Sequence, residues 1–290
     1  MFVRTAFGAL FGLLLNGALL ASPTPAPSAT PALSATPAAE ITAAPSTKLT
    51  PEEMTRAVKT DAITIPTPGE LFAALGKPAK PDWAARFRGP IAMNYKTRAQ
   101  IALNLGGLVA DGFIAVEAQD AQQVKNIGGD IVKMAKALGV SENILSRGNS
   151  ISQFAENDEW SALQEELEAT QNEVKSSMQS HRDQDLVILV SLGGWIRGTQ
   201  VVSAVVSKNY DEKLGQALRQ PELLRFIRSK ISQISPDLQN DPLVKSVNTQ
   251  LAGIEQAVAT PLGQTLTAAQ VTKLNSDVDK LMQEIQRKDP

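Results

Sequence analysis

The stretch from residue 183 to residue 208 constrains the fold more than any other part of this 290-residue chain. It is apolar on nearly every side, and its Val/Ile-rich beginning continues directly into a helical pattern. A helix of this kind has to be covered on all sides. Arg197 lies near its middle, and an arginine at the centre of a bilayer costs at least about 2.5 kcal/mol. We therefore expect a buried central helix of a soluble bundle.

Other segments are predicted to form helices that could surround this central helix: residues 93–119, 121–138, 158–181, 241–258 and 267–285. In the last three of these, apolar residues are spaced three and four apart, as in an amphipathic helix. A turn at residues 261–263 joins the last two, which predicts an antiparallel hairpin. No segment shows convincing period-two alternation. The sequence thus predicts an all-α fold: a bundle of about seven to nine helices preceded by a disordered linker.

The first residues have the layout of a cleavable secretory signal peptide. Arg4 precedes an apolar run over residues 6–20, and small residues follow at Ala21 and Ser22. We expect cleavage after Ala21. Residues 22–47 consist almost wholly of Ala, Pro, Ser and Thr, a composition that cannot bury enough apolar surface to fold. The predicted organisation is a signal peptide (1–21), a disordered linker (22–47) and a single all-helical domain (48–290).

Helix-start signals begin where the linker ends. Residues 50–53 and 67–70 both place a threonine, a proline and, three residues after the threonine, a glutamate. The hydroxyl and the carboxylate can satisfy backbone donors that the first turn of a helix leaves free. We expect a helix to start at each of these positions.

The amino-acid composition restricts where the protein can act and which partners it can bind. The chain has no cysteine, which excludes disulfides, a thiolate nucleophile and a lipidated cysteine anchor, and its net charge is −2. We therefore expect an exported protein, periplasmic in a Gram-negative cell or secreted, with no stable membrane insertion after signal cleavage. Without a basic excess, nucleic acid is not an expected partner.

Two predicted helices share a glycine pattern, LNLGGL at residues 103–108 and VSLGGW at residues 190–195. A glycine inside a helix costs about 0.5 to 1 kcal/mol relative to alanine, so a glycine pair needs a compensating gain. Close approach of two backbones supplies one. The predicted contact residues are the glycines Gly106, Gly107, Gly193 and Gly194.

Charged residues flank both glycine pairs at nearly the same offset of 87 positions. If the two helices run parallel and in register, Arg98 meets Asp185 and Asp111 meets Arg197. We predict these as buried or half-buried ion pairs, which would fix the register of the helices without necessarily adding stability. The alternative is that these four charges reach solvent or other partners. Together they are the candidate polar pocket of the protein.

Other residues that could carry chemistry occur in unfavourable settings. His181 is the single histidine and ends an apolar stripe, and Ser191 lacks the strand and the elbow motif that present a nucleophile. The carboxylates of residues 156–173 lack the loop or the Glu-x-x-His spacing of metal sites and are expected to form a solvated face. Residues 83–96 mix basic and aromatic side chains, which can bind anionic ligands but more often form the edge of a core. We predict no catalytic, cofactor-binding or metal-binding residues, and no cofactor.

These observations favour a non-enzymatic binding or interaction module of the cell envelope over an enzyme. Its partner would be a protein or a small ligand. Two alternatives stay open: a carboxylate- and arginine-based periplasmic enzyme, for example one that processes glycans, and a purely structural envelope protein. A deep polar pocket around Arg98, Asp111 and Arg197 would favour ligand binding or catalysis. A closed core at that place would leave only the outer surface to act.

Overall fold

The computed structural model describes residues 65–79, 81–140, 147–180, 183–261 and 263–288. Contacts divide the chain into two units, Met1–Thr50 and Pro51–Pro290, and every described residue belongs to the second. The predicted signal peptide, the linker, the helix start at residues 50–53 and His181 lie outside the described residues.

All regular structure in the described residues is helical, which confirms the all-α prediction. In chain order the elements are α2 (Pro68–Ala79), the 3₁₀ helix η1 (Ala84–Arg86), α3 (Arg98–Glu117), α4 (Ala121–Ala137), α6 (Gly148–Glu156), α7 (Trp160–Ser180), α8 (Gln184–Lys208), α9 (Glu212–Ala217), α10 (Pro221–Ile231), α11 (Pro236–Asn240), α12 (Pro242–Val258) and α13 (Ala268–Gln286). Nine of the described α-helices have nine or more residues, in agreement with the predicted number.

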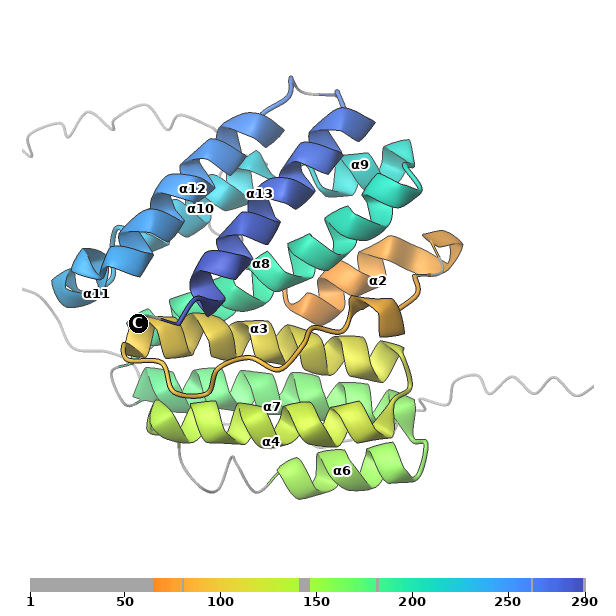
Figure 1. The fold of residues 1–290 in the computed structure, drawn as a ribbon, viewed down its shortest axis with the longest axis vertical. Helices are drawn as coiled ribbons and strands as arrows, with labels where there is room; N and C mark the ends of the chain where they lie inside the picture. The colour runs from red at the N-terminus through yellow and green to blue at the C-terminus, as the bar shows by residue number, and fades with distance from the viewer. Residues whose placement is uncertain (1–64, 80, 141–146, 181–182, 262, 289–290) are drawn as a thin grey trace, which may run out of the picture. The chain divides into compact units, whose positions relative to one another are not determined.

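The centre of the bundle is the pair α3 and α8, which contact each other more extensively than any other two described elements. In Figure 1, α3 lies along the same direction as α4 and α7, whereas α8, α12 and α13 run obliquely to it. α4 and α7 cover α3 on one side, and α13 and α2 cover α8. The nearly all-apolar helix predicted from residue 183 is therefore buried, as expected.

Residues 65–97, which we call the N-terminal arm, consist of α2, η1 and an extended connection that leads into α3. α2 begins with the predicted capping box: the Thr67 hydroxyl accepts a hydrogen bond from the backbone N–H of Glu70 at 3.2 Å, and the Glu70 carboxylate accepts one from the N–H of Thr67 at 2.6 Å. Its apolar side chains Leu71, Phe72 and Leu75 are buried. The first part of the arm thus packs on the bundle through the apolar face of α2.

The predicted start of the long helix at residue 93 is wrong, because α3 begins at Arg98. Thr97 is its N-cap and accepts a hydrogen bond from the backbone N–H of Gln100 at 3.1 Å. A hydroxyl at this position stabilises a helix end rather than a helix interior, and the residues before it stay extended. Met93 and Tyr95, which the predicted range placed in the helix, therefore precede it.

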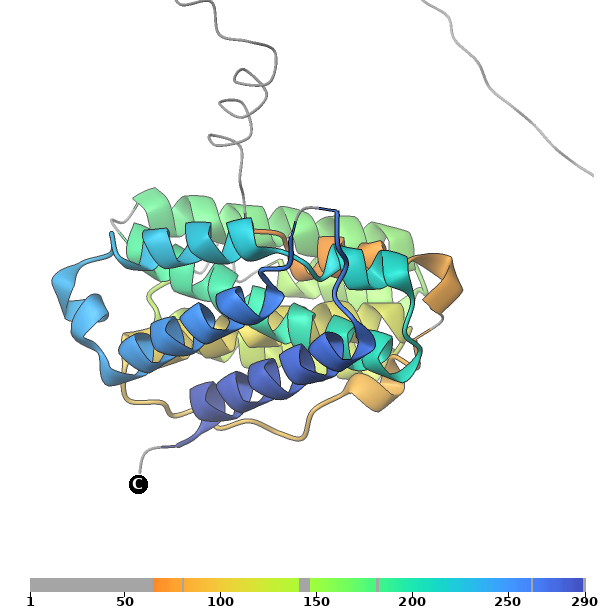
Figure 2. The ribbon, with the colours of Figure 1, turned by 90° about the horizontal axis from the view of Figure 1, so that it is seen from above.

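The last two long helices form the predicted hairpin. α12 and α13 pack side by side in both views and are joined by a short connection (Figures 1 and 2). Thr267 and Gln270 make a capping box at the start of α13. The apolar stripe predicted for α13 is buried, with Val271, Val278 and Ile285 fully inside.

By length and composition alone, α3 and α8 could each cross a membrane. In the bundle, 89% of the most apolar stretch of α3 and 78% of that of α8 are buried inside the protein. The central helices of a water-soluble bundle satisfy the same criterion. Their apolar surface is covered here by other helices.

Candidate functional site

The contact between α3 and α8 is built on two glycines that face each other's backbone. A Cβ atom placed on Gly106 would lie 1.9 Å from the carbonyl oxygen of Val190, and one on Gly193 would lie 1.9 Å from that of Leu103. The two contacts are equivalent under an exchange of the helices, with an offset of 87 positions. Any side chain larger than hydrogen would force the backbones apart. The structure therefore places the repeated glycine motifs against each other. The ion pairs Arg98–Asp183 and Asp111–Arg197 on either side show that the two oblique helices run in the same general direction.

The second glycine of each motif has a different role. A Cβ atom on Gly194 would lie 3.3 Å from the carbonyl oxygen of Gly106 and 3.3 Å from Pro68 of α2, so this glycine serves two contacts. Gly107 does not face α8, and its predicted role in that contact is wrong. Its neighbours are the guanidinium group of Arg88, at 3.3 Å from a Cβ placed there, and Met282 of α13. Successive helical residues point about 100° apart, so only one of two adjacent glycines can face the same partner squarely.

Asp111 and Arg197 form the ion pair expected at one end of this contact. Arg197 Nε donates to Asp111 Oδ1 at 2.8 Å, and the two residues are only 4% and 6% exposed. Arg88, from the N-terminal arm, donates to the other carboxylate oxygen, Oδ2, through its Nε atom at 2.8 Å and through Nη2. One aspartate thus holds two arginines, one from the central helix and one from the arm.

Further hydrogen bonds extend this ion pair into a chain that reaches α13. Arg197 donates through Nη2 to the backbone oxygen of Arg86 at 2.5 Å and through Nη1 to Gln200 Oε1 at 2.7 Å. Gln200 in turn donates to Asp279 of α13 at 2.6 Å. All three donor nitrogens of the Arg197 guanidinium are therefore bonded inside the protein. We call Arg88, Asp111, Arg197, Gln200 and Asp279 the polar chain.

The electrostatics of the polar chain reflect its burial. Desolvation lowers the pKa of Arg197 below its ordinary value, and the charge of Asp111 opposes that shift while the nearby charge of Arg88 adds to it. Arg88 Nη1 is buried and has no hydrogen-bond partner among the described residues. Two buried cations around one carboxylate form an arrangement that costs desolvation energy, so it specifies geometry more than it adds stability.

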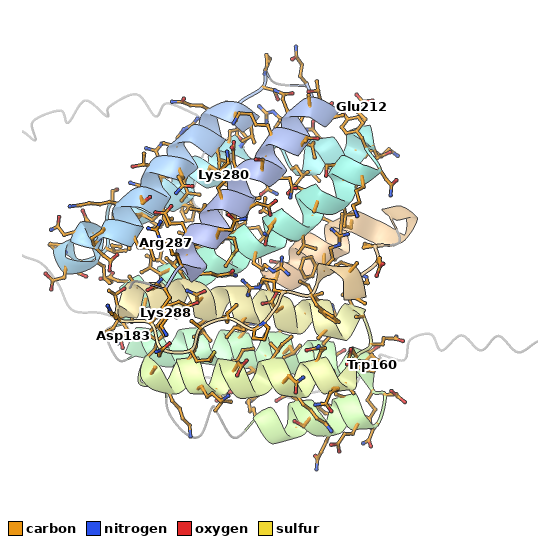
Figure 3. The ribbon with its side chains drawn as sticks, viewed as in Figure 1. Trp160, Asp183, Glu212, Lys280, Arg287 and Lys288 are labelled. Atoms are coloured by element: carbon orange, nitrogen blue, oxygen red, sulfur yellow. The ribbon has the colours of Figure 1, made fainter. Side chains whose placement is uncertain are left out.

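The ion pair predicted at the other end, between Arg98 and Asp185, does not form. Arg98 pairs instead with Asp183 at 3.1 Å, at the surface, with 54% of the Arg98 side chain exposed. Asp185 accepts a hydrogen bond from the backbone N–H of Ser235, which starts α11. Arg98 is the first residue of α3, where its long side chain can reach past the helix register to Asp183, which precedes α8. Figure 3 shows Asp183 at the end of the bundle where α3 begins.

The candidate polar pocket predicted from Arg98, Asp111, Asp185 and Arg197 is therefore divided. Asp111 and Arg197 lie together in a closed interior, whereas Arg98 and Asp185 lie elsewhere with other partners. The arm covers the pair, through Arg88 and the backbone of Arg86. Such a closed cluster can fix the register of α3 on α8 and fasten the arm. The Asp111 side chain is only 9% exposed, and both of its carboxylate oxygens accept hydrogen bonds from arginines.

Sequence reasoning missed a second group of buried amides. Gln100 donates to the carbonyl oxygens of Ile285 and Arg287, and Asn104 donates to that of Ile285 at 2.9 Å. The last carbonyl groups of a helix have no hydrogen-bond donors within that helix. At the C-terminus of α13, the side chains of Gln100 and Asn104 in α3 are these donors. In the sequence, Asn104 could have indicated this contact, because it is a polar residue between two leucines of the glycine motif.

A small pocket lies away from the polar chain, where α2 covers α8. Leu71 and Ala74 of α2 form one wall, and Trp195, Thr199 and Val202 of α8 form another. Residues of α10, α12 and α13 complete it. Its volume is about 30 Å³, far below the several hundred Å³ of a typical metabolite site.

The acidic segment predicted as a solvated face forms the outer side of α7. Glu165 and Glu168 are exposed, and Arg147 pairs with Glu166 and Glu173 at 3.1 and 2.7 Å. Within the described residues, no three His, Cys, Asp or Glu side chains gather as metal ligands. A comparison of the chain with protein-family models, with curated proteins and with solved structures finds no match.

Proposed function

We propose that this protein is an exported, non-enzymatic binding module that acts through its outer surface. The observation that carries the proposal is the closed state of the polar chain. Asp111 and Arg197, the charged residues best placed for chemistry, are almost wholly buried, and their polar atoms bond to Arg88, Arg86 and Gln200. Since a catalytic carboxylate has to reach its substrate, this arrangement favours a structural role for the interior.

The outer face of α7 is the surface that best suits a partner. Ser161, Glu165, Glu168 and Ala169 are exposed and lie along one side of the helix. Glu165 and Glu168 form no ion pair with a described residue, unlike the two glutamates that Arg147 holds. Unpaired carboxylates on a rigid helix favour a cationic protein surface, because complementary charge accelerates association and selects the partner.

The proposed export of the protein is supported by the sequence of its first residues. Residues 1–21 have the layout of a secretory signal, and residues 22–47 have the composition of a tether. We expect the intact mass of the protein purified from its own cells to correspond to a chain that begins at Ser22. A mass that includes Met1 would refute the export proposal.

Photo-crosslinking in the cells of origin tests the binding proposal. A benzoylphenylalanine at Ser161 or Ala169 leaves both glutamates in place, and the same group at the exposed Gln283 of α13 is the matched control. We expect one adduct of defined mass from the α7 positions and none from position 283. The substitution Glu165→Lys should abolish the adduct while the thermal unfolding midpoint stays unchanged, whereas Glu168 is kept because its carboxylate lies near Gly69 at the start of α2.

Two outcomes would contradict the binding proposal. One is an adduct that survives the charge reversal, which would show that the Glu165 carboxylate does not select the partner. The other is the absence of any adduct from α7 together with an enzymatic activity that Asp111→Asn abolishes in a protein that is still folded. That result would restore the enzyme alternative.

A further inference from the structure

The pocket beneath α2 supports an inference that goes beyond the proposed function, because it lies apart from the outer face of α7. Its walls are nearly all apolar, with Leu71 on one side and Trp195 and Val202 on the other. The polar residues among them are Gln220 and Thr199. Thr199 is 5% exposed, and its buried hydroxyl has no hydrogen-bond partner among the described residues. A buried hydroxyl without a partner destabilises the protein, so a ligand that forms a hydrogen bond with it gains affinity.

The other polar group at the pocket is already engaged. The indole N–H of Trp195 donates to Gln220 Oε1 at 3.3 Å, and the Gln220 amide donates to the backbone oxygen of Ala217 at 3.0 Å. Thr199 is thus the position at which a ligand can find a free hydrogen-bonding group. Apolar walls with one hydroxyl suit a molecule with an apolar chain and a single hydroxyl or carbonyl group.

The present volume of about 30 Å³ leaves room for about two water molecules, so an alkyl chain requires one wall to move. Of the helices that line the pocket, α2 makes the fewest hydrogen bonds to other described parts of the protein. The polar contacts of its described side chains stay within its own capping box, between Thr67 and Glu70. It rests on α8 through apolar contacts at Gly194 and Gly198. Its displacement would break no hydrogen bond to another described helix.

We propose that the space between α2 and α8 is a binding site for a small amphiphile, an unbranched alkyl chain bearing one hydroxyl or carbonyl group, and that α2 is its lid. The hydroxyl of Thr199 bonds to the polar group of the ligand. The alkyl chain takes the place along Trp195 and Val202 that Leu71 partly fills when the lid is closed.

The structure provides a way to lock this lid. A Cβ atom on Gly198 would lie 3.7 Å from Cβ of Leu71, a separation that a disulfide accepts. Because the chain has no cysteine, the double variant Leu71→Cys/Gly198→Cys can form one disulfide within the chain. The oxidised form holds α2 closed, and the reduced form of the same protein is the matched control.

The experiment uses the full chain labelled with 5-fluorotryptophan and titrated with 1-pentanol, followed by ¹⁹F NMR. Trp195 lines the pocket, Trp83 packs against Phe72 of α2 at 5.1 Å between ring centroids, and Trp160 belongs to a separate apolar cluster. We expect saturable shifts of the Trp195 and Trp83 resonances in the original and the reduced protein, and none in the oxidised form. The Trp160 resonance should not move.

The variant Thr199→Val keeps the shape of the side chain and removes the hydroxyl. It should weaken 1-pentanol binding about fivefold, the effect of one hydrogen bond, without changing the ¹⁹F spectrum of the free protein. The proposal is overturned if the Trp195 resonance does not shift, or if it shifts without saturation together with Trp160. Equal binding by the oxidised and reduced forms would refute the lid, and an unchanged affinity of Thr199→Val would refute the assigned chemistry.

Discussion

α8 packs against two neighbours through glycines, and the two contacts differ in what meets the glycine. On the side of α3, a Cβ on Gly193 would lie 1.9 Å from a backbone carbonyl oxygen. On the side of α2, a Cβ on Gly198 would lie 2.6 Å from the tip of the Leu71 side chain. Backbone in a helix cannot yield, whereas a leucine can change its rotamer.

This difference separates a contact that defines the fold from one that can open. The α3–α8 contact joins two backbones and ends in the buried polar chain, so its geometry is fixed at several points. The contact of the N-terminal arm relies on apolar side chains of α2, on Arg88, and on Tyr95, whose hydroxyl donates weakly at 3.4 Å to the backbone of Gln286. Substitutions at the two contacts should therefore differ in their effect on stability.

The largest effect is expected at the backbone contact. Gly106→Ala should destabilise the protein by more than about 4 kcal/mol, or prevent folding, because the new methyl group overlaps the Val190 carbonyl and both helices have to separate. The midpoint of urea unfolding measures it. Gly253→Ala in α12 is the matched control, since a Cβ there meets nothing within 4 Å, and it should stabilise by about 0.5 to 1 kcal/mol. Similar urea midpoints for Gly106→Ala and Gly253→Ala would show that the close backbone contact at Gly106 does not constrain the fold.

Substitution of Asp111, at the buried end of the α3–α8 contact, should destabilise the protein nearly as much. Asp111→Asn leaves Arg88 and Arg197 buried without a carboxylate and should cost about 3 kcal/mol. The control lies at the other end of α3. Arg98→Ala removes an exposed ion pair with Asp183 and should cost at most about 0.5 kcal/mol in the same urea experiment. Equal losses would mean that burial does not distinguish the two ends.

A smaller and local effect is expected where α2 meets α8. In Gly198→Ala the steric cost of moving the Leu71 side chain is offset by the better helix propensity of alanine, so global stability should change by no more than about 1 kcal/mol. Hydrogen exchange should become faster in α2 and stay unchanged at the amides of α3 and α8. Faster exchange throughout the bundle would show that α2 is as integral to the core as α3.

The smallest effect concerns the arm at high pH. Burial raises the pKa of Tyr95 above its ordinary value of 10.0, and the charge of Arg88 opposes the shift. Tyrosine in the unfolded chain therefore loses its proton before Tyr95 does in the folded one. The stability that Tyr95 contributes is present below pH 10.0 and is lost as the pH rises through its folded pKa. Urea midpoints above pH 10.0 should fall more steeply for the original protein than for Tyr95→Phe, and parallel curves would contradict this.

The helical fold and the central contact followed from the sequence because they depend on periodicity and on the cost of glycine inside helices. The repeated LGG motif supplied the partner, the direction and the register of α3 and α8. The motif does not indicate which of two adjacent glycines faces the partner helix. Only the structure shows that Gly106 faces α8 and that Gly107 makes room for Arg88. The pairing of Asp111 with Arg197 also followed, since the offset between the two glycine motifs brings these residues to within one position of each other.

Partners at helix ends and partners of amides could not be derived in the same way. Arg98 starts α3, where a long side chain is not restricted by register, and it selects Asp183 rather than Asp185. Gln100, Asn104 and Gln200 carry no charge and follow no periodic pattern, yet they hold the α13 terminus and extend the polar chain. The partner of Gln100 and Asn104 at Ile285 lies 185 and 181 positions away, and Asp279 lies 79 positions from Gln200, so local sequence does not encode these contacts.

The separation of these partners along the chain also determines the order in which the protein can fold. Asp111 and Arg197 are 86 positions apart, and the bond from Gln100 to Ile285 spans 185. A chain synthesised from its N-terminus cannot cover α3 until α8 has emerged, and cannot satisfy the end of α13 until synthesis is complete. Long-range contacts of this kind slow folding. The contact of α8 with α3 and the cover that α13 provides therefore form late, whereas α3 can pack on α4 as soon as both have been synthesised.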